Sequence, residues 1–155
     1  RINTVLLTGN ATSAETIQYF RTFCPNVVYA RGDQDDHADD IEEVVTLTLG
    51  DLKFAVMHGH QVVPWGDKEA LAMWQRKLDV DVLVTGHTHK DKYYEVDGKL
   101  FVNPGSATGA FSCFDGDVTP TFVLMDVQGT NVTSFIYSSV DGQEPKVKKK
   151  VYSKA

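Results

Sequence analysis

Histidine, aspartate and asparagine side chains follow several short apolar runs of this sequence, and side chains of these types bind transition metals. In the stretch LVTGHTHKD, residues 83–91, an apolar run reaches Gly86 and is followed by His87 and His89. We expect a buried strand that Gly86 ends by adopting backbone angles that other residues avoid. On an extended backbone, side chains at i and i+2 point the same way, so these two imidazoles could share one cation. The alternative is a pair of structural histidines, each hydrogen-bonded to the backbone.

Three further apolar runs end in residues of the same kind, namely Asn10, Asp33 and His58. In open α/β sheets ligands bind in the crevice beyond the carboxyl ends of the strands, so these candidates are expected to meet there. Imidazole, carboxylate and amide together suit Zn, Mn or Fe, and are too rich in nitrogen for a calcium site. Each residue alone is typical of a turn, and only their convergence favours a metal site. The segment 103–106 (NPGS) follows another strand and either lines the same crevice or forms a plain turn.

The elements that must position these residues begin with a β-α-β unit. The opening INTVLLTGN predicts a strand. Thr12 with Glu15 then predicts a capping box, with Thr12 as the N-cap of an amphipathic helix. Residues 27–30 are the next predicted strand, which implies a right-handed parallel crossover.

The rest of the chain changes from alternating strands and helices to antiparallel hairpins. Two strand-like runs are joined at Gly50-Asp51, and Asp67 is the expected N-cap of a second helix. Beyond residue 90 the pattern predicts hairpins, the first with its turn at Asp97-Gly98. An α/β fold with two packed sheets follows. The 155 residues fit one domain, 1–155, with 144–155 as a basic C-terminal strand or tail.

Composition excludes several classes of protein. The net charge of −6 disfavours nucleic-acid binding. The basic cluster of Lys146 and 148–150 is better explained by a solvated strand or tail than by contact with anionic lipid. Cys24 and Cys113 are far apart and in no metal-type spacing, which favours free thiols in a reducing compartment. No apolar run approaches the roughly 20 residues that cross a bilayer, and no signal peptide is recognised, so we expect a soluble, cytoplasmic protein.

Five short motifs carry a family resemblance. TGN, RGDQD, HGH, GHTH and NPGS, in this order and spacing, resemble the calcineurin-like metallophosphoesterases, which hydrolyse phosphate esters with two bridged metals. The longer blocks HGHQVVPWGD, LDVDVLVTGHTHK, VNPGSATGA and FVLMDVQG narrow the resemblance to the retromer subunits of this superfamily, from about Leu6 to Tyr137. The resemblance implies a sandwich of two mixed β-sheets flanked by helices. The opening strand of the family, which carries Asp-x-His, has no counterpart here, so the sandwich is expected to lack its first strand.

The same resemblance implies that Asn10, Asp33, His58 and His87 serve one metal, and that Asn10 and His89 serve the other. Two departures argue against catalysis. Asn10 stands where active members carry a bridging Asp, and Gln34 stands where they carry the catalytic His. An amide does not titrate near neutral pH, so Gln34 cannot act as a general acid. Two divalent cations would carry four positive charges, whereas this set of ligands offers one carboxylate. We therefore expect no required cofactor, and either a single weakly held divalent metal, Zn or Mn, or none.

The function implied by the resemblance is that of a non-catalytic scaffold in the retromer cargo-recognition complex. The face around the metal-type site would dock on the α-solenoid subunit for endosome-to-Golgi transport, and the complex would hold the protein peripherally on the endosome membrane. A second, apolar surface would bind regulatory proteins. Positions that match this surface are Val63, Leu124, Phe135 and Tyr137. The alternative is a metal-dependent phosphodiesterase, and the acidic loop 33–40, where His37 is a further candidate ligand, is expected to be solvated.

Overall fold

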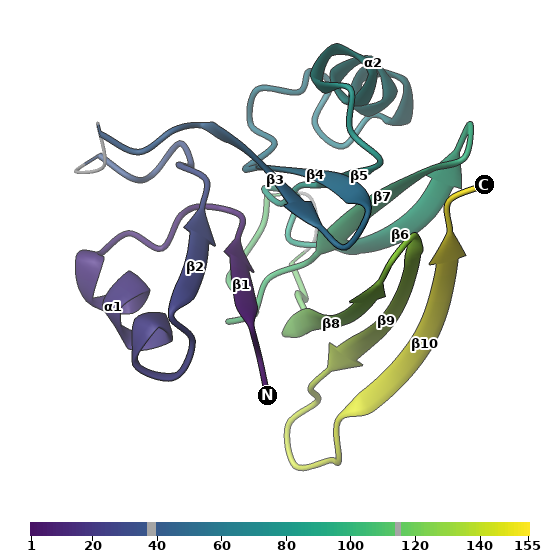
Figure 1. The fold of residues 1–155 in the computed structure, drawn as a ribbon. Helices are drawn as coiled ribbons and strands as arrows, with labels where there is room; N and C mark the ends of the chain where they lie inside the picture. The colour runs from purple at the N-terminus through teal and green to yellow at the C-terminus, as the bar shows by residue number, and fades with distance from the viewer. Residues whose placement is uncertain (37–39, 114–115) are drawn as a thin grey trace.

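The computed structural model describes residues 1–36, 40–113 and 116–155, so His37 lies outside the described residues. Two helices and ten strands are found within these ranges (Figure 1). The elements in chain order are β1 (Thr4–Leu7), α1 (Ala14–Phe23), β2 (Asn26–Tyr29), β3 (Val44–Leu49), β4 (Leu52–Met57), α2 (Lys68–Leu78), β5 (Val82–Val84), β6 (Asp91–Val96), β7 (Lys99–Pro104), β8 (Thr121–Gln128), β9 (Asn131–Ser138) and β10 (Lys146–Ser153). Over the same ranges, no helix combines the length and apolarity that crossing a membrane requires.

The central layer is a five-stranded mixed sheet in the order β3-β4-β5-β7-β6. Strands β4, β5 and β7 run parallel, and β3 and β6 pair antiparallel at the two edges. The sheet separates two apolar clusters because side chains alternate between its faces. Ala55 and Met57 of β4 pack with Leu71 of α2 on one face, whereas Phe54 and Val56 pack on the other face with residues of β9 and β10. The predicted α/β sandwich is therefore confirmed.

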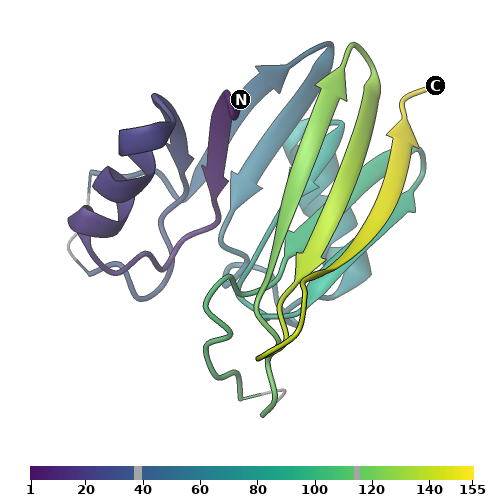
Figure 2. The same ribbon diagram turned by 90° about the horizontal axis from the view of Figure 1, so that it is seen from below.

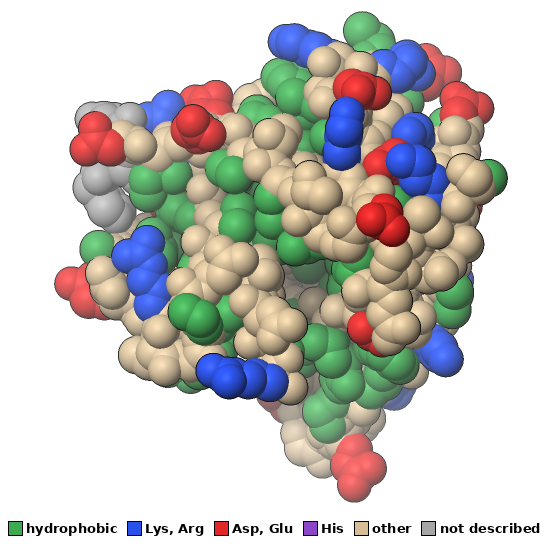
Figure 3. All heavy atoms as spheres, in the orientation of Figure 1, with side chains coloured by type: hydrophobic (Ala, Val, Ile, Leu, Met, Phe, Trp, Pro, Cys, Tyr) green, Lys and Arg blue, Asp and Glu red, His purple; other side chains and the backbone are tan. Residues whose placement is uncertain are grey.

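The second layer consists of two separate sheets and is not one continuous sheet (Figure 2). One is the parallel pair β1-β2, and the other is the antiparallel set β10-β9-β8. Leu6 of β1 and Val123 of β8 pack against the same core cluster. In the part of the chain that is described, β1 pairs only with β2 and β8 only with β9, so each has one edge without a strand partner. Figure 3, in the orientation of Figure 1, shows hydrophobic side chains around a hollow near the centre of the view.

The helix caps confirm one prediction and correct another. Asp67 is the N-cap of α2, and its carboxylate accepts a hydrogen bond of 2.8 Å from the Ala70 amide. The N-cap of α1 is Ser13 and not Thr12. Thr12 has a φ of 59° and donates its amide to Asp35, so it cannot adopt the extended backbone that an N-cap requires.

Candidate functional site

Asp33, His58 and His87 converge where the loops after β2, β4 and β5 meet. The Nε2 atom of His58 lies 3.1 Å from Nδ1 of His87 and 3.1 Å from Oδ1 of Asp33. The Asp33 and His87 atoms are 3.8 Å apart. Ligands placed about 2.1 Å from a tetrahedral zinc are separated by about 3.4 Å. These three atoms therefore form a triangle of the size that one divalent ion requires.

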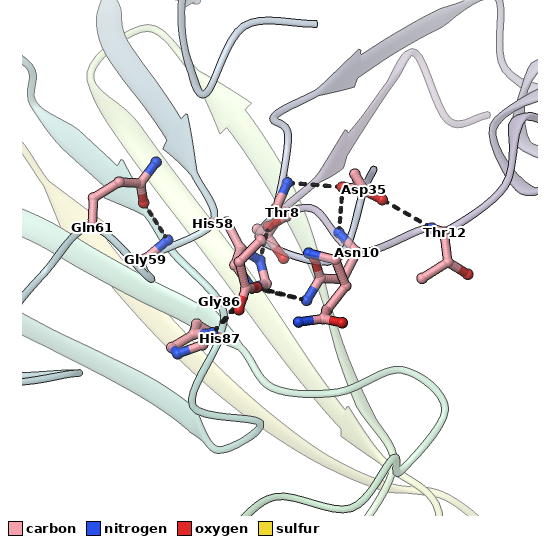
Figure 4. Close-up of polar contacts among 12 residues, drawn as sticks. Thr8, Asn10, Thr12, Asp35, His58, Gly59, Gln61, Gly86 and His87 are labelled. Carbon is pink, nitrogen blue, oxygen red and sulfur yellow. Dashed lines mark hydrogen bonds and ion pairs between the residues drawn. The ribbon is translucent and has the colours of Figure 1, made fainter. Parts of the chain in front are cut away.

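The side chains of His58 and His87 face each other in the cluster (Figure 4). His58 is buried, and its Nδ1 lies 2.6 Å from the carbonyl oxygen of Thr8. Because a carbonyl only accepts, Nδ1 of His58 carries the proton and Nε2 presents its lone pair to the cluster. Burial lowers the pKa of His58 and that of His87, so both imidazoles are neutral near pH 7.

Asp33 supplies the only carboxylate of this triad, and Asn10 lies against it. Burial alone would raise the pKa of Asp33, but the hydrogen bond of 3.1 Å from the Asn10 amide and the neighbouring His58 lower it. The Asn10 nitrogen also lies 3.1 Å from Nε2 of His58, while the Asn10 oxygen accepts a hydrogen bond of 2.9 Å from the Gln34 amide. Asn10 thus presents a donor to the cluster, and binding a metal would require its amide group to turn round.

Asp35 organises this half of the site, although no sequence pattern distinguishes it from its acidic neighbours. It is buried and accepts hydrogen bonds from the amides of Gly32, Asn10 and Thr12, at 2.8, 2.8 and 3.0 Å, and from the Tyr29 hydroxyl. Burial alone would raise the pKa of Asp35, but these hydrogen bonds lower it. The carboxylate therefore joins the loop after β1 to the loop after β2.

Tight packing explains two of the glycines in the motifs. A Cβ on Gly32 would lie 2.0 Å from the Asn10 side-chain oxygen, so no larger residue fits beside Asn10. Gly86 was predicted to adopt backbone angles that other residues avoid, but its φ is not positive. A Cβ on Gly86 would lie 2.8 Å from the Thr8 hydroxyl, and this close approach is what requires glycine there.

His87 and His89 do not follow an extended backbone, so that expectation was wrong. Their φ angles are 68° and 57°, which turns the two side chains away from a common direction. His87 faces His58, whereas Nδ1 of His89 lies 2.9 Å from the Ala110 carbonyl oxygen. Asn103 supports the same turn, because its amide donates hydrogen bonds of 3.0 Å to the Gly86 carbonyl and to the Thr88 hydroxyl.

The loop between β4 and α2 places apolar side chains beside the cluster. The Trp65 ring lies edge-on to His87 with a centroid separation of 4.4 Å, and 45% of Trp65 is exposed. Val63, which precedes a cis proline, is 76% exposed. The metal-type cluster and this apolar loop therefore belong to one face.

The other predicted binding residues lie on a different element. Leu124 of β8 pairs in register with Phe135 of β9, and Phe122 pairs with Tyr137, on the outer face of the sheet. Phe122 and Tyr137 stack with a centroid separation of 4.8 Å. Phe135 and Tyr137 are half-buried, and the residues that alternate with them are buried. Val63 is not part of this sheet, so the four predicted positions fall on two separate surfaces.

Comparison with known proteins decides the family. The profile of the calcineurin-like phosphoesterase superfamily domain matches residues 1–130. Vacuolar protein sorting-associated protein 29 (Vps29) of Schizosaccharomyces pombe is 40% identical over 162 residues, which cover 99% of this chain and 83% of the relative. The chain belongs to the Vps29 family. A crystal structure of a single-mutant Vps29 from Entamoeba histolytica superposes with a TM-score of 0.94 at 44% identity, covering 99% of this chain and 84% of that one.

A second structure of a Vps29-family protein bears on the metal. The wild-type Vps29 of Entamoeba histolytica complexed with Zn²⁺ matches with a TM-score of 0.92 and 46% identity, over 97% of this chain and 83% of that one. In the present Vps29-family chain, two neutral imidazoles and one carboxylate give a donor set of net charge −1. This set suits a single borderline-soft divalent ion such as zinc, because nitrogen donors dominate it.

Proposed function

We propose that this chain is a non-catalytic scaffold subunit of retromer that docks on the α-solenoid subunit for endosome-to-Golgi transport. The observation that carries the proposal is the contact between Trp65 and His87, which joins an exposed apolar loop to a site poor in carboxylates. Exposed apolar side chains around a partly buried polar cluster are typical of a protein-binding surface. Attachment to the endosome membrane would be peripheral, through the complex.

The residues around the cluster argue against hydrolysis. Two-metal hydrolysis requires cations beside both the attacking and the leaving oxygen, and Asp33 is the only carboxylate in the described triad. Asn10 presents its amide nitrogen, which would repel a cation. Gln34 supplies a backbone amide to Asn10 and has no side-chain proton that titrates near neutral pH. These features support a scaffold that has kept the fold of an enzyme.

Docking is tested by calorimetry with the C-terminal part of the α-solenoid subunit. The change Val63→Asp places a charge on the exposed loop and is expected to weaken binding at least tenfold, because a buried unpaired charge is costly. Val140→Asp is the matched control, since Val140 is 38% exposed in the loop between β9 and β10. Equal affinities of the two variants would contradict the proposed docking face.

We infer that the cluster holds at most one weakly bound divalent metal, Zn or Mn, and requires none to fold. His58→Ala is expected to lower zinc affinity by about 10- to 100-fold, whereas His89→Ala is expected to change it less than threefold. Isothermal titration with ZnCl₂ measures both. Binding of two zinc ions per chain with equal affinity would overturn the single-site assignment.

The alternative of a metal-dependent phosphodiesterase has one observation in its favour, the ligand-sized triangle of Asp33, His58 and His87. Gln34→His restores an imidazole next to this triangle. If the scaffold proposal holds, the variant hydrolyses bis(p-nitrophenyl) phosphate no faster than the unchanged chain in the presence of Mn²⁺. A rise of a hundredfold would favour the enzyme.

We further propose that regulatory proteins bind the outer face of β8 and β9 around Leu124, Phe135 and Tyr137. Leu124 is 36% exposed and Phe122 beside it is 54% exposed, so both offer apolar area to a partner. Leu124→Asp should abolish regulator binding and leave docking on the α-solenoid subunit unchanged. Loss of both interactions in this variant would contradict the proposal that the two partners bind separate surfaces.

A further inference from the structure

A cavity of about 250 Å³ lies between α2 and the strands β6 and β7, beneath the turns that carry His58 and His87. Its floor is formed by the buried side chains of Val62, Leu71 and Phe101. Trp65 of the proposed docking face also lines it, and the proposed metal binding does not use it. This volume lies just below the usual range of ligand pockets, so it would suit only a small molecule, of one ring with a short side arm.

Flat aromatic surfaces form two of its walls. Tyr94 and Phe101 stack with a centroid separation of 5.2 Å and an interplanar angle of 3°. Trp65 lines the mouth. Rings held in this way favour a planar apolar ligand that stacks or lies edge-on against them.

The rim carries positive charge in a chain whose net charge is −6. Lys68, Lys90 and Lys92 line the cavity, and none of the described lining residues is acidic. The Lys68 ammonium lies 4.8 Å from the centroid of the Tyr94 ring, so its charge is held over the aromatic wall. Asp67 and Glu69 flank Lys68 in the chain, and neither lines the cavity. The Asp67 carboxylate accepts a hydrogen bond from the Ala70 amide as the helix N-cap, and its charge also acts on Tyr94.

A polar group inside the cavity wall is left without a partner. The Tyr94 hydroxyl is buried and makes no hydrogen bond to any described residue. Such a group costs free energy unless a ligand or water pairs with it. Burial raises the pKa of Tyr94, so the hydroxyl keeps its proton and can donate it to an anion.

We propose that this cavity binds a small amphipathic anion, an arylalkyl carboxylate, with its ring against Tyr94 and Trp65. Its carboxylate would be bound by the ammonium groups of Lys68 and Lys92 and by the Tyr94 hydroxyl. The inference requires neither a metal nor a partner protein, but the cavity shares Trp65 with the proposed docking face.

The test is a titration of the full chain followed by ¹⁵N–¹H NMR, with 3-phenylpropionate and its neutral amide as probes. Saturable shifts are expected for the Trp65 indole and for residues 88, 92 and 94, and the carboxylate should bind about tenfold more tightly than the amide. The double change Lys68→Gln/Lys92→Gln should remove that preference, and Tyr94→Phe should lower the affinity for the carboxylate about threefold.

Lys77→Gln is the matched control, since Lys77 is also on α2 but lies over Trp74, 4.7 Å from its ring centroid, and does not line the cavity. It should bind the carboxylate as the unchanged chain does. No saturable shift with either probe, equal affinity for the acid and the amide, or shifts confined to the His58 cluster would overturn the assignment.

Discussion

The two halves of the metal-type cluster come from regions of very different burial. His58 and His87 follow β4 and β5, whose residues are buried except for Lys53. Asn10 and Asp33 follow β1 and β2, in which Tyr29 alone is buried. The histidine half is therefore fixed by a packed sheet, whereas the carboxylate half depends on hydrogen bonds between loops.

This difference in burial implies that the docking face and the metal site differ in stability. A five-stranded sheet that buries both faces keeps its geometry whatever happens at the site. The β1-β2 sheet has only two strands and, of their residues, only Tyr29 is buried, so we expect it to open more easily than the five-stranded sheet. A metal that needs both halves at once would be held weakly. A docking face built on the β4-α2 loop would persist.

The largest expected contrast is between core residues of the two regions. Phe54→Ala in β4 removes a fully buried ring and should lower the free energy of unfolding by about 4 kcal/mol. Leu6→Ala in β1 removes a half-buried side chain and should cost about 1–2 kcal/mol. Urea denaturation measures both. Losses of equal size would remove the distinction between the regions.

Asp35 gives the next contrast, within the loop half of the site. Asp35→Ala leaves three amides and the Tyr29 hydroxyl without their acceptor and should cost about 3 kcal/mol. Asp36→Ala is the control, because Asp36 is exposed. The same urea series applies, and a similar effect of the two changes would mean that Asp35 does not organise the loops.

Asp81 provides a pH test on the sheet side. It is buried and accepts hydrogen bonds from Lys99, Lys154 and the Lys53 amide, at 2.8, 3.0 and 3.0 Å. Burial alone would raise the pKa of Asp81, but these donors lower it from 3.8 to about 2. Its stabilisation is therefore fully present above about pH 4 and is lost as the pH falls toward 2, by about 1–2 kcal/mol.

The matching variant is Asp81→Asn, which removes the charge at every pH. Its stability deficit relative to the unchanged chain should shrink between pH 5 and pH 2.5, as followed by urea unfolding at both values. A deficit that stays constant across this range would show that Asp81 is not charged in the folded protein.

The smallest effect is expected at the ion pair that links the end of β2 to the start of β3. Arg31 and Glu43 are 2.9 Å apart, with side chains 27% and 45% exposed. Exposed pairs contribute little, so Glu43→Gln should cost no more than about 0.5 kcal/mol by thermal unfolding. A loss above about 2 kcal/mol would show that the loop half depends on charge and not on Asp35.

The sequence predicted elements correctly where the pattern has a local physical cause. The hairpin turn at Asp97-Gly98, the Asp67 cap and the buried strand before Gly86 follow from turn chemistry, capping and hydrophobic runs, and all are present. The association of His58, His87 and Asp33 followed from strand ends meeting at one edge of a sheet.

The features that were not predicted from the sequence depend on tertiary contacts. Asp35 lies in an acidic stretch that predicts solvent, and only the meeting of two loops buries it. The direction of His89 follows from left-handed backbone angles at residues 87 and 89, which the GHTH motif does not specify. The division of the second layer depends on pairing between distant strands, which local periodicity cannot determine.

The most direct test of the account compares docking on the α-solenoid subunit in ZnCl₂ and in EDTA, by calorimetry on the full chain. We expect affinities that agree within about threefold, because the docking face is set by the sheet and the Trp65 loop and not by the metal. Loss of binding in EDTA, with binding restored by added zinc, would contradict it.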